Sequence, residues 1–173
     1  MLFTIGHSNR PLDELLEMLR SAGVKRLVDV RAVPKSRRWP QYNGTRLAQS
    51  LAAAGIDYAW RGEALGGFRQ PRPDSPNVAL AGAFRGFADH MARPAFASAV
   101  DELLAGAVPT AIMCAEKLPA ECHRSLIADY VLARGVEVVH LIAPDVRETA
   151  RRNPAARAAP GGLVYDGGEQ RLL

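Results

Sequence analysis

Short apolar runs alternate with amphipathic stretches along most of the chain. Runs of strand length occur at residues 2–5, 25–31, 56–60, 110–114 and 136–142. Between them, apolar residues recur at the spacing of one helix face, as in the leucines of residues 11–22. Strands that alternate with helices predict an α/β fold with a mainly parallel sheet, helices on both faces and a Rossmann-like arrangement.

The remaining segments have no regular pattern. Residues 61–77 combine glycines, prolines and arginines, which predicts a long loop that is either functional or disordered. Residues 144–161 are rich in Ala, Arg and Pro and have no strong period, so we expect an irregular C-terminal extension over residues 143–173, beyond a core of about residues 2–142. Within this extension, residues 163–168 predict a small hairpin with the last residues. The length of 173 residues with 48% hydrophobic content predicts a single domain over residues 1–173.

Hydropathy also bears on localisation. No apolar stretch approaches the ~20 residues that a membrane span requires, so we expect no membrane partner. The amino terminus, MLFTIGHSNR, lacks the basic-then-apolar layout of a signal peptide, which predicts a cytoplasmic protein. In that compartment the only two cysteines, Cys114 and Cys122, are expected to be reduced thiols.

The positive charge of the chain is concentrated in its first half. Residues 1–72 contain twelve Lys/Arg and six Asp/Glu, whereas the remainder contains ten and twelve. This pattern indicates a surface for an anion or a nucleic acid. The alternative is a solvated surface in an arginine-biased chain, since 19 of the 22 basic residues are Arg. No acidic residue occurs from Val30 to Ile56, a stretch that holds Arg31, Lys35, Arg37, Arg38, Trp39, Tyr42 and Arg46.

Polar and reactive side chains follow three of the predicted strands. Right-handed crossovers place the carboxyl ends of parallel strands at one edge of the sheet, where open α/β proteins build their sites. We therefore expect these side chains to share one site. They are His7 and Ser8 after the first strand, Asp29 and Arg31 at the end of the second, and Cys114, Glu116, Cys122, His123 and Arg124 at the end of the fourth strand and the start of the helix after it.

Four ordered motifs carry a resemblance to a known family. They are TIGHSN at residues 4–9, DVRAVPKSR at 29–37, LGG at 65–67 and CAEKLPAECHR at 114–124. Over roughly Phe3 to Ile142 the sequence resembles the family called domain of unknown function 488. The resemblance implies one α/β domain with a single site but no reaction, because no activity is established for the family. The site residues it implies are His7, Ser8, Asp29, Arg31, Pro34, Ser36, Arg37, Cys114, Glu116, Cys122, His123 and Arg124.

Cys114 has three interpretations. At the end of a strand, facing a helix start and the arginines, its thiol would have a lowered pKa and act as a nucleophile, with His7 or His123 as base. The alternatives are a metal ligand and a small buried hydrophobe, which is what most free cysteines are. The spacing argues against the anion loop of cysteine phosphatases, because Ala120 stands where their arginine follows the cysteine.

A metal site is open to the same residues. Cys114, Cys122, His123 and His7 are the sulfur and nitrogen ligands that zinc accepts. Adjacent residues on a helix point about 100° apart, so a helical Cys122-His123 pair predicts no metal, and we expect no cofactor. Several of the other groups can have a structural role instead. His123 would bond to Glu116 or Glu121, His140 would lie in the core, and His90 would lie on the surface. Asp29 and Arg31 would form an ion pair.

Two function classes remain. We favour an enzyme, a Cys-dependent transferase or hydrolase acting on a small anionic substrate such as a nucleotide or phosphoester. Nucleic-acid binding alone gives no reason to gather Cys, Glu, His and Asp at one edge. The alternative is a nucleic-acid-binding module whose loops 31–46 and 61–72 use Trp39, Tyr42, Trp60 and Phe68 to stack bases. For the enzyme, the expected catalytic residues are Cys114, Glu116, His7 and His123, and the expected substrate-binding residues are Ser8, Asp29, Arg31, Ser36, Arg37, Cys122 and Arg124. The oligomeric state is left open.

Overall fold

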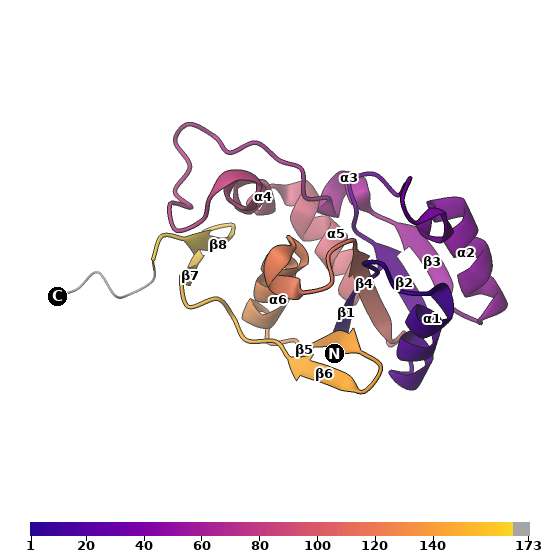
Figure 1. Cartoon of the computed structure of the whole chain (residues 1–173). Helices are drawn as coiled ribbons and strands as arrows, with labels where there is room; N and C mark the ends of the chain where they lie inside the picture. The colour runs from indigo at the N-terminus through magenta and orange to yellow at the C-terminus, as the bar shows by residue number, and fades with distance from the viewer. Residues whose placement is uncertain (168–173) are drawn as a thin grey trace.

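The fold is organised around a six-stranded sheet in the order β3-β2-β4-β1-β5-β6 (Figure 1). The computed structural model describes residues 1–167. Strands β1 to β5 pair in parallel, and β6 runs antiparallel to β5 at one edge. The predicted α/β class with a mainly parallel sheet is therefore confirmed. The strands are β1 (Leu2–Gly6), β2 (Arg26–Asp29), β3 (Asp57–Trp60), β4 (Thr110–Cys114), β5 (Val138–Ala143) and β6 (Val146–Thr149).

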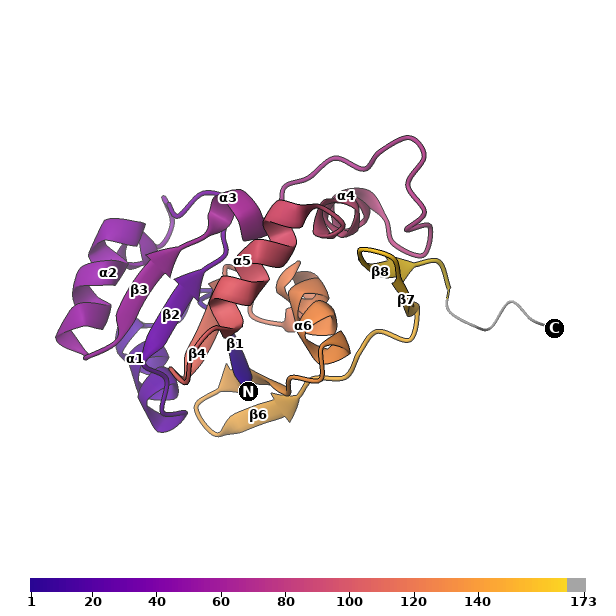
Figure 2. The same ribbon diagram turned by 180° about the vertical axis from the view of Figure 1, so that it is seen from behind.

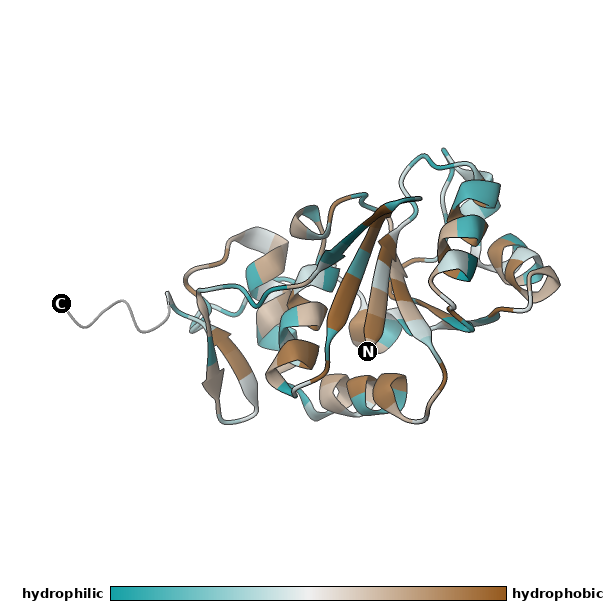
Figure 3. Cartoon of the chain, turned by 90° about the horizontal axis from the view of Figure 1, so that it is seen from below, coloured by the Kyte–Doolittle hydropathy of each residue, from teal (hydrophilic) through white to brown (hydrophobic). Residues whose placement is uncertain are grey.

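Helices cover both faces of the sheet (Figure 2). Each face has its own apolar core. Neighbouring strand residues alternate between the two cores, as Ile112 and Met113 do, because successive side chains of a strand point to opposite faces. Apolar residues accordingly run along the central strands in Figure 3. One core uses α1 (Leu12–Ser21) and α2 (Gly44–Ala53), and the other uses α3 (Gly62–Leu65), α4 (Gly82–Met91), α5 (Pro94–Leu104) and α6 (Arg124–Ala133).

Residues after Ala143 contain more regular structure than their composition predicted. Besides β6, they form an antiparallel hairpin of β7 (Ala156–Ala159) and β8 (Gly162–Tyr165). The hairpin was predicted, but its partner strand precedes residues 163–165 rather than following them; residues 168–173 lie outside the described part of the chain. The Tyr165 hydroxyl, fully buried, donates to Asp129 Oδ2 at 2.9 Å and so attaches the hairpin to α6.

The long loop between α3 and α4 is ordered by one carboxylate. Asp89 on α4 accepts hydrogen bonds from Ser75 Oγ at 2.6 Å, Asn77 Nδ2 at 2.8 Å and the Arg72 backbone N–H at 2.9 Å. Burial alone would raise the pKa of Asp89, but these hydrogen bonds outweigh it and lower the pKa. The loop is therefore an ordered part of the fold. Within residues 1–167, no helix is long and apolar enough to cross a membrane.

The chain between β4 and α6 differs from the sequence prediction, which placed Cys122 and His123 in a helix. Pro119–Glu121 form only a 3₁₀ turn, Cys122 is extended with φ −139° and ψ 142°, and α6 begins at Arg124. Proline fits the first position of an α-helix and of a 3₁₀ helix, so the sequence pattern does not distinguish them. The prediction that Cys122 lies within the first helical turn was wrong.

Candidate functional site

A cavity of about 680 Å³ lies at the carboxyl edge of the sheet. Of the predicted site residues, it brings together those that follow β1 and β4 and part of the loop after β2. Asp29, Pro34, Arg37 and Arg124 are not among the residues that line it. The predicted residues that line the cavity are His7, Ser8, Arg31, Ser36, Cys114, Glu116, Cys122 and His123.

Two thiols and an imidazole meet at the base of the cavity. His123 Nδ1 lies 3.7 Å from Cys114 Sγ and 3.6 Å from Cys122 Sγ, and both cysteines are free and nearly buried. His123 Nε2 is 3.1 Å from the Val30 carbonyl oxygen. A carbonyl can only accept, so Nε2 carries a proton and Nδ1 is the atom that faces the sulfurs. The expected bond from His123 to Glu116 or Glu121 is replaced by this contact with Val30.

The extended backbone at Cys122 explains how both neighbours reach the same point. On a helix, the side chains of residues 122 and 123 would diverge, whereas the break before α6 turns the two together. The Arg124 backbone N–H points at Cys122 Sγ over 3.5 Å, at the start of α6. The helix start therefore directs positive partial charge at this sulfur.

The two thiols have opposite acidities. Cys114 shares a hydrogen bond with Cys122, is buried, and donates to Glu116 Oε2 at 3.2 Å, and all three effects raise its pKa. Burial also opposes ionisation of Cys122, but its hydrogen bonds with Cys114 and His123 and the charges of His123 and Arg124 outweigh burial and lower its pKa. The predicted lowering of the Cys114 pKa is thus wrong: the thiolate of the pair belongs to Cys122, because Cys114 faces a carboxylate.

The sequence of the chain matches one family of proteins. The sequence model described as "Domain of unknown function DUF488" matches residues 11–131. The chain belongs to this family. No curated protein and no solved structure matches the chain significantly.

In this DUF488 domain, Arg124 holds the loop after β4 in place from the protein interior. Its side chain is fully buried and donates to the carbonyls of Glu116 at 2.6 Å and Lys117 at 2.7 Å. Gly6 supports the same loop, because a Cβ at this position would lie 1.7 Å from the Glu116 carbonyl oxygen. The loop after β4 crosses directly over the end of β1, and only glycine permits that approach.

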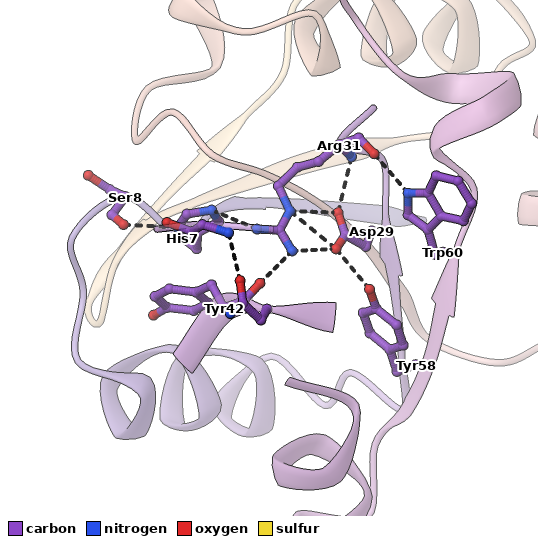
Figure 4. Close-up of polar contacts among 9 residues, drawn as sticks. His7, Ser8, Asp29, Arg31, Tyr42, Tyr58 and Trp60 are labelled. Atoms are coloured by element: carbon purple, nitrogen blue, oxygen red, sulfur yellow. Dashed lines mark hydrogen bonds and ion pairs between the residues drawn. The ribbon is translucent and has the colours of Figure 1, made fainter. Parts of the chain in front are cut away.

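The side of the DUF488 cavity next to β1 and β2 is held by a buried ion pair (Figure 4). Arg31 Nη2 donates to Asp29 Oδ2 at 2.6 Å and Nε to Oδ1 at 2.9 Å, so the expected ion pair is present. The Arg31 backbone N–H also donates to Asp29 Oδ1 at 3.0 Å, and the Tyr58 hydroxyl donates to Oδ2 at 2.9 Å. Asp29 is therefore a buried anchor that orients Arg31.

His7 is held in one tautomer by the same network. Arg31 Nη1 lies 3.2 Å from His7 Nε2, and because guanidinium only donates, Nε2 is the acceptor. Nδ1 then carries the proton, 2.9 Å from the Ser8 carbonyl oxygen, and the ring stacks on Tyr42 at 4.2 Å. Burial lowers the pKa of His7 to about 4, and the charge of Arg31 acts in the same direction. A ring with its lone pair occupied is a weak base.

Several residues that line the cavity were not predicted as site residues. Lys35, Arg38 and Trp39 lie in the acid-free stretch noted from the sequence, which was the available signal. Phe84 comes from α4, and Gly67 belongs to the LGG motif. Phe68, 87% exposed, also lines the cavity, as do Asn9, Ala32, Val33, Ala83, Ala115 and Glu121.

The two remaining histidines serve the core. His140 Nδ1 bonds to Thr4 Oγ1 at 2.7 Å between neighbouring strands, as its apolar surroundings predicted. His90 was predicted to lie on the surface, but it is buried and its Nε2 lies 2.7 Å from the Ala64 carbonyl oxygen. The prediction was wrong because this contact joins α4 to α3, which a long loop separates in the sequence, and a local sequence pattern does not reveal such a contact.

Proposed function

We propose that this DUF488 domain is an enzyme that acts on a small anionic substrate of the nucleotide or phosphoester kind. One observation carries the proposal: a thiol–imidazole group and a set of cationic side chains line the same cavity. The first comprises Cys114, Cys122 and His123 with Glu116 beside them, and the second comprises Arg31, Lys35 and Arg38. Reactive groups next to an anion-binding wall are the arrangement that group transfer or hydrolysis requires.

The proposed roles divide between the two walls. Lys35 and Arg38 bind the anionic group, and Arg31, fixed by Asp29, contributes charge from the floor of the cavity. Trp39, over which the Arg38 guanidinium lies at 5.5 Å, offers an aromatic surface for a base or another ring. His123 Nδ1 is the group placed to exchange a proton beside the sulfurs. His7 serves as a support for Arg31 rather than as a base.

The structure favours this proposal over a nucleic-acid-binding module. Of the four aromatic residues expected to stack bases, Tyr42 is fully buried and its hydroxyl donates to the Arg10 carbonyl. Trp60 is also engaged, because its Nε1 donates to the Arg31 carbonyl at 2.9 Å. Trp39 and Phe68 lie at the cavity, where they suit one small ligand better than a strand.

Ligand-induced stabilisation tests the proposal. Inorganic phosphate and nucleoside phosphates should raise the Tm of the wild type, and at a ligand concentration of 100 times Kd the gain of about 2.7 kcal/mol corresponds to about 5–11 °C. The double variant Lys35→Ala/Arg38→Ala should lose most of this gain. Arg37→Ala is the matched control, because Arg37 is equally exposed in the same segment but does not line the cavity.

Two results would overturn the proposal. One is a wild type that none of these anions stabilises. The other is equal stabilisation of the double variant and the wild type, which would place anion binding away from this cavity.

A further inference from the structure

The three atoms at the base of the cavity are spaced like the ligands of a metal ion. In a tetrahedral zinc site, with Zn–S of about 2.3 Å and Zn–N of about 2.0 Å, sulfur and nitrogen lie about 3.5 Å apart. His123 Nδ1 lies 3.6 Å from Cys122 Sγ and 3.7 Å from Cys114 Sγ. All three ligand atoms lie within 4.8 Å of one another. Two edges of the ligand triangle thus already have the required length.

We propose that Cys114, Cys122 and His123 bind one thiophilic divalent ion, Zn²⁺, with its fourth coordination position open to the cavity. The sequence argument against a metal assumed a helical Cys122-His123 pair, and the extended conformation of Cys122 removes that objection. Two sulfurs and one imidazole favour zinc over Mg²⁺ or Ca²⁺, which take oxygen ligands.

Contacts behind the ligands hold the imidazole in place. His123 Nε2 donates to the Val30 carbonyl, and a metal-binding histidine usually makes this kind of contact through its other nitrogen. Gly67 borders the ring on a further side: a Cβ there would lie 2.8 Å from Nδ1 and 3.1 Å from Cγ. A glycine at this point leaves the ligand nitrogen clear.

The surroundings fit a catalytic ion better than a structural one. A structural zinc site is closed by four protein ligands, whereas a catalytic site has three and leaves one position for water or substrate. All three ligands line the cavity, and so does Glu116, whose Oε2 lies 3.2 Å from Cys114 Sγ. In this arrangement the two sulfurs and His123 Nδ1 are ligands, so that nitrogen exchanges no proton while the ion is bound. The anionic substrate of the proposed function, on which this step rests, meets the ion at its open position.

Cobalt substitution tests the site directly. Protein dialysed against a chelator and titrated with Co²⁺ should bind one ion per chain, with a thiolate-to-cobalt charge-transfer band and the intense d–d bands of tetrahedral coordination. Zn²⁺ should displace the cobalt and abolish these bands. An octahedral cobalt spectrum without the charge-transfer band would overturn the proposal, and this readout needs no variant.

Variants assign the ligands. Cys114→Ser, Cys122→Ser and His123→Gln should each weaken Zn²⁺ affinity more than 100-fold, and Gly67→Ala should weaken it about 10- to 100-fold by displacing the ring. Glu121→Gln, a cavity residue outside the ligand set, is the control and should bind like the wild type. Affinities equal to the control in the cysteine variants would contradict the site.

Metal binding and substrate binding are separable in these experiments. Lys35→Ala/Arg38→Ala should keep full Zn²⁺ affinity while losing phosphate stabilisation. A wild type that binds Zn²⁺ but is stabilised by no anion would count against the proposed function alone. A wild type that anions stabilise but that binds no Zn²⁺ would count against the metal site alone.

Discussion

Replacing Asp29 by Asn should destabilise the protein strongly, because it removes the charge that compensates Arg31. Asp29 is fully buried and Arg31 is 6% exposed, so the guanidinium cannot move into water without opening the site. In the variant, an amide faces Arg31 Nε and Nη2. Its NH₂ group is itself a donor, so it cannot accept the hydrogen bond that the carboxylate oxygen accepted from the guanidinium. Arg31 would retain its bond to the Tyr42 carbonyl at 2.7 Å.

Breaking one partner of a buried ion pair typically costs 3–5 kcal/mol, and the asparagine oxygen still accepts one bond, so we expect a loss of about 3 kcal/mol. For a chain of this length that corresponds to a decrease in Tm of about 6–12 °C. Tyr58→Phe, which removes only the hydroxyl donor to Asp29, should cost about 1.5 kcal/mol.

Urea unfolding at neutral pH measures these differences, with the slope m as a check that the unfolded states are comparable. Asp57→Asn is the matched control, because Asp57 is exposed on the neighbouring strand β3, and it should change stability by less than about 0.5 kcal/mol. If Asp29→Asn is as stable as Asp57→Asn, the buried pair does not hold this side of the cavity.

Two further predictions concern the loop over β1 and the pH dependence of stability. Gly6→Ala should cost about 3 kcal/mol and disturb Zn²⁺ binding, since its Cβ would overlap the Glu116 carbonyl; an unchanged urea midpoint would refute this contact. Burial lowers the pKa of His140 to about 4, below the unfolded value, so the unfolded state binds more protons and stability falls as pH falls from 6.5 to 4. In His140→Gln, the decrease in stability between pH 6.5 and 4 should be smaller by about 3 kcal/mol than in the wild type. Identical pH profiles of unfolding for the two proteins would contradict the lowered pKa of His140.

Most of the sheet was predictable because its strands are buried. The residues of β4, for example, are all buried and read as an apolar run. Strand β6, by contrast, is exposed throughout, so its sequence Val-Arg-Glu-Thr carries no alternation that distinguishes a strand from a loop. The hairpin strand β7 is mostly Ala, and its pairing with β8 is a tertiary property.

The site was predictable in position and less so in detail. His7, Arg31 and Cys114 reach the same cavity because parallel strands end at one edge, a rule that needs only the order of the elements. Cys122 and His123 reach the same point only because the chain is extended at Cys122. The sequence did not predict this break, since Pro119 fits the start of an α-helix as well as that of a 3₁₀ turn. Phe84 comes from a helix after a long loop, and no local pattern connects it to the cavity.

A crystal soaked with tungstate, a heavy tetrahedral anion, tests the central claim most directly. The account predicts an anomalous peak inside the cavity, within hydrogen-bonding distance of Lys35 or Arg38 and on the side that faces Cys122 and His123. A tungstate site that forms only elsewhere on the surface, with the cavity lacking an anomalous peak, would contradict the claim that this cavity is built to hold an anion beside the thiols.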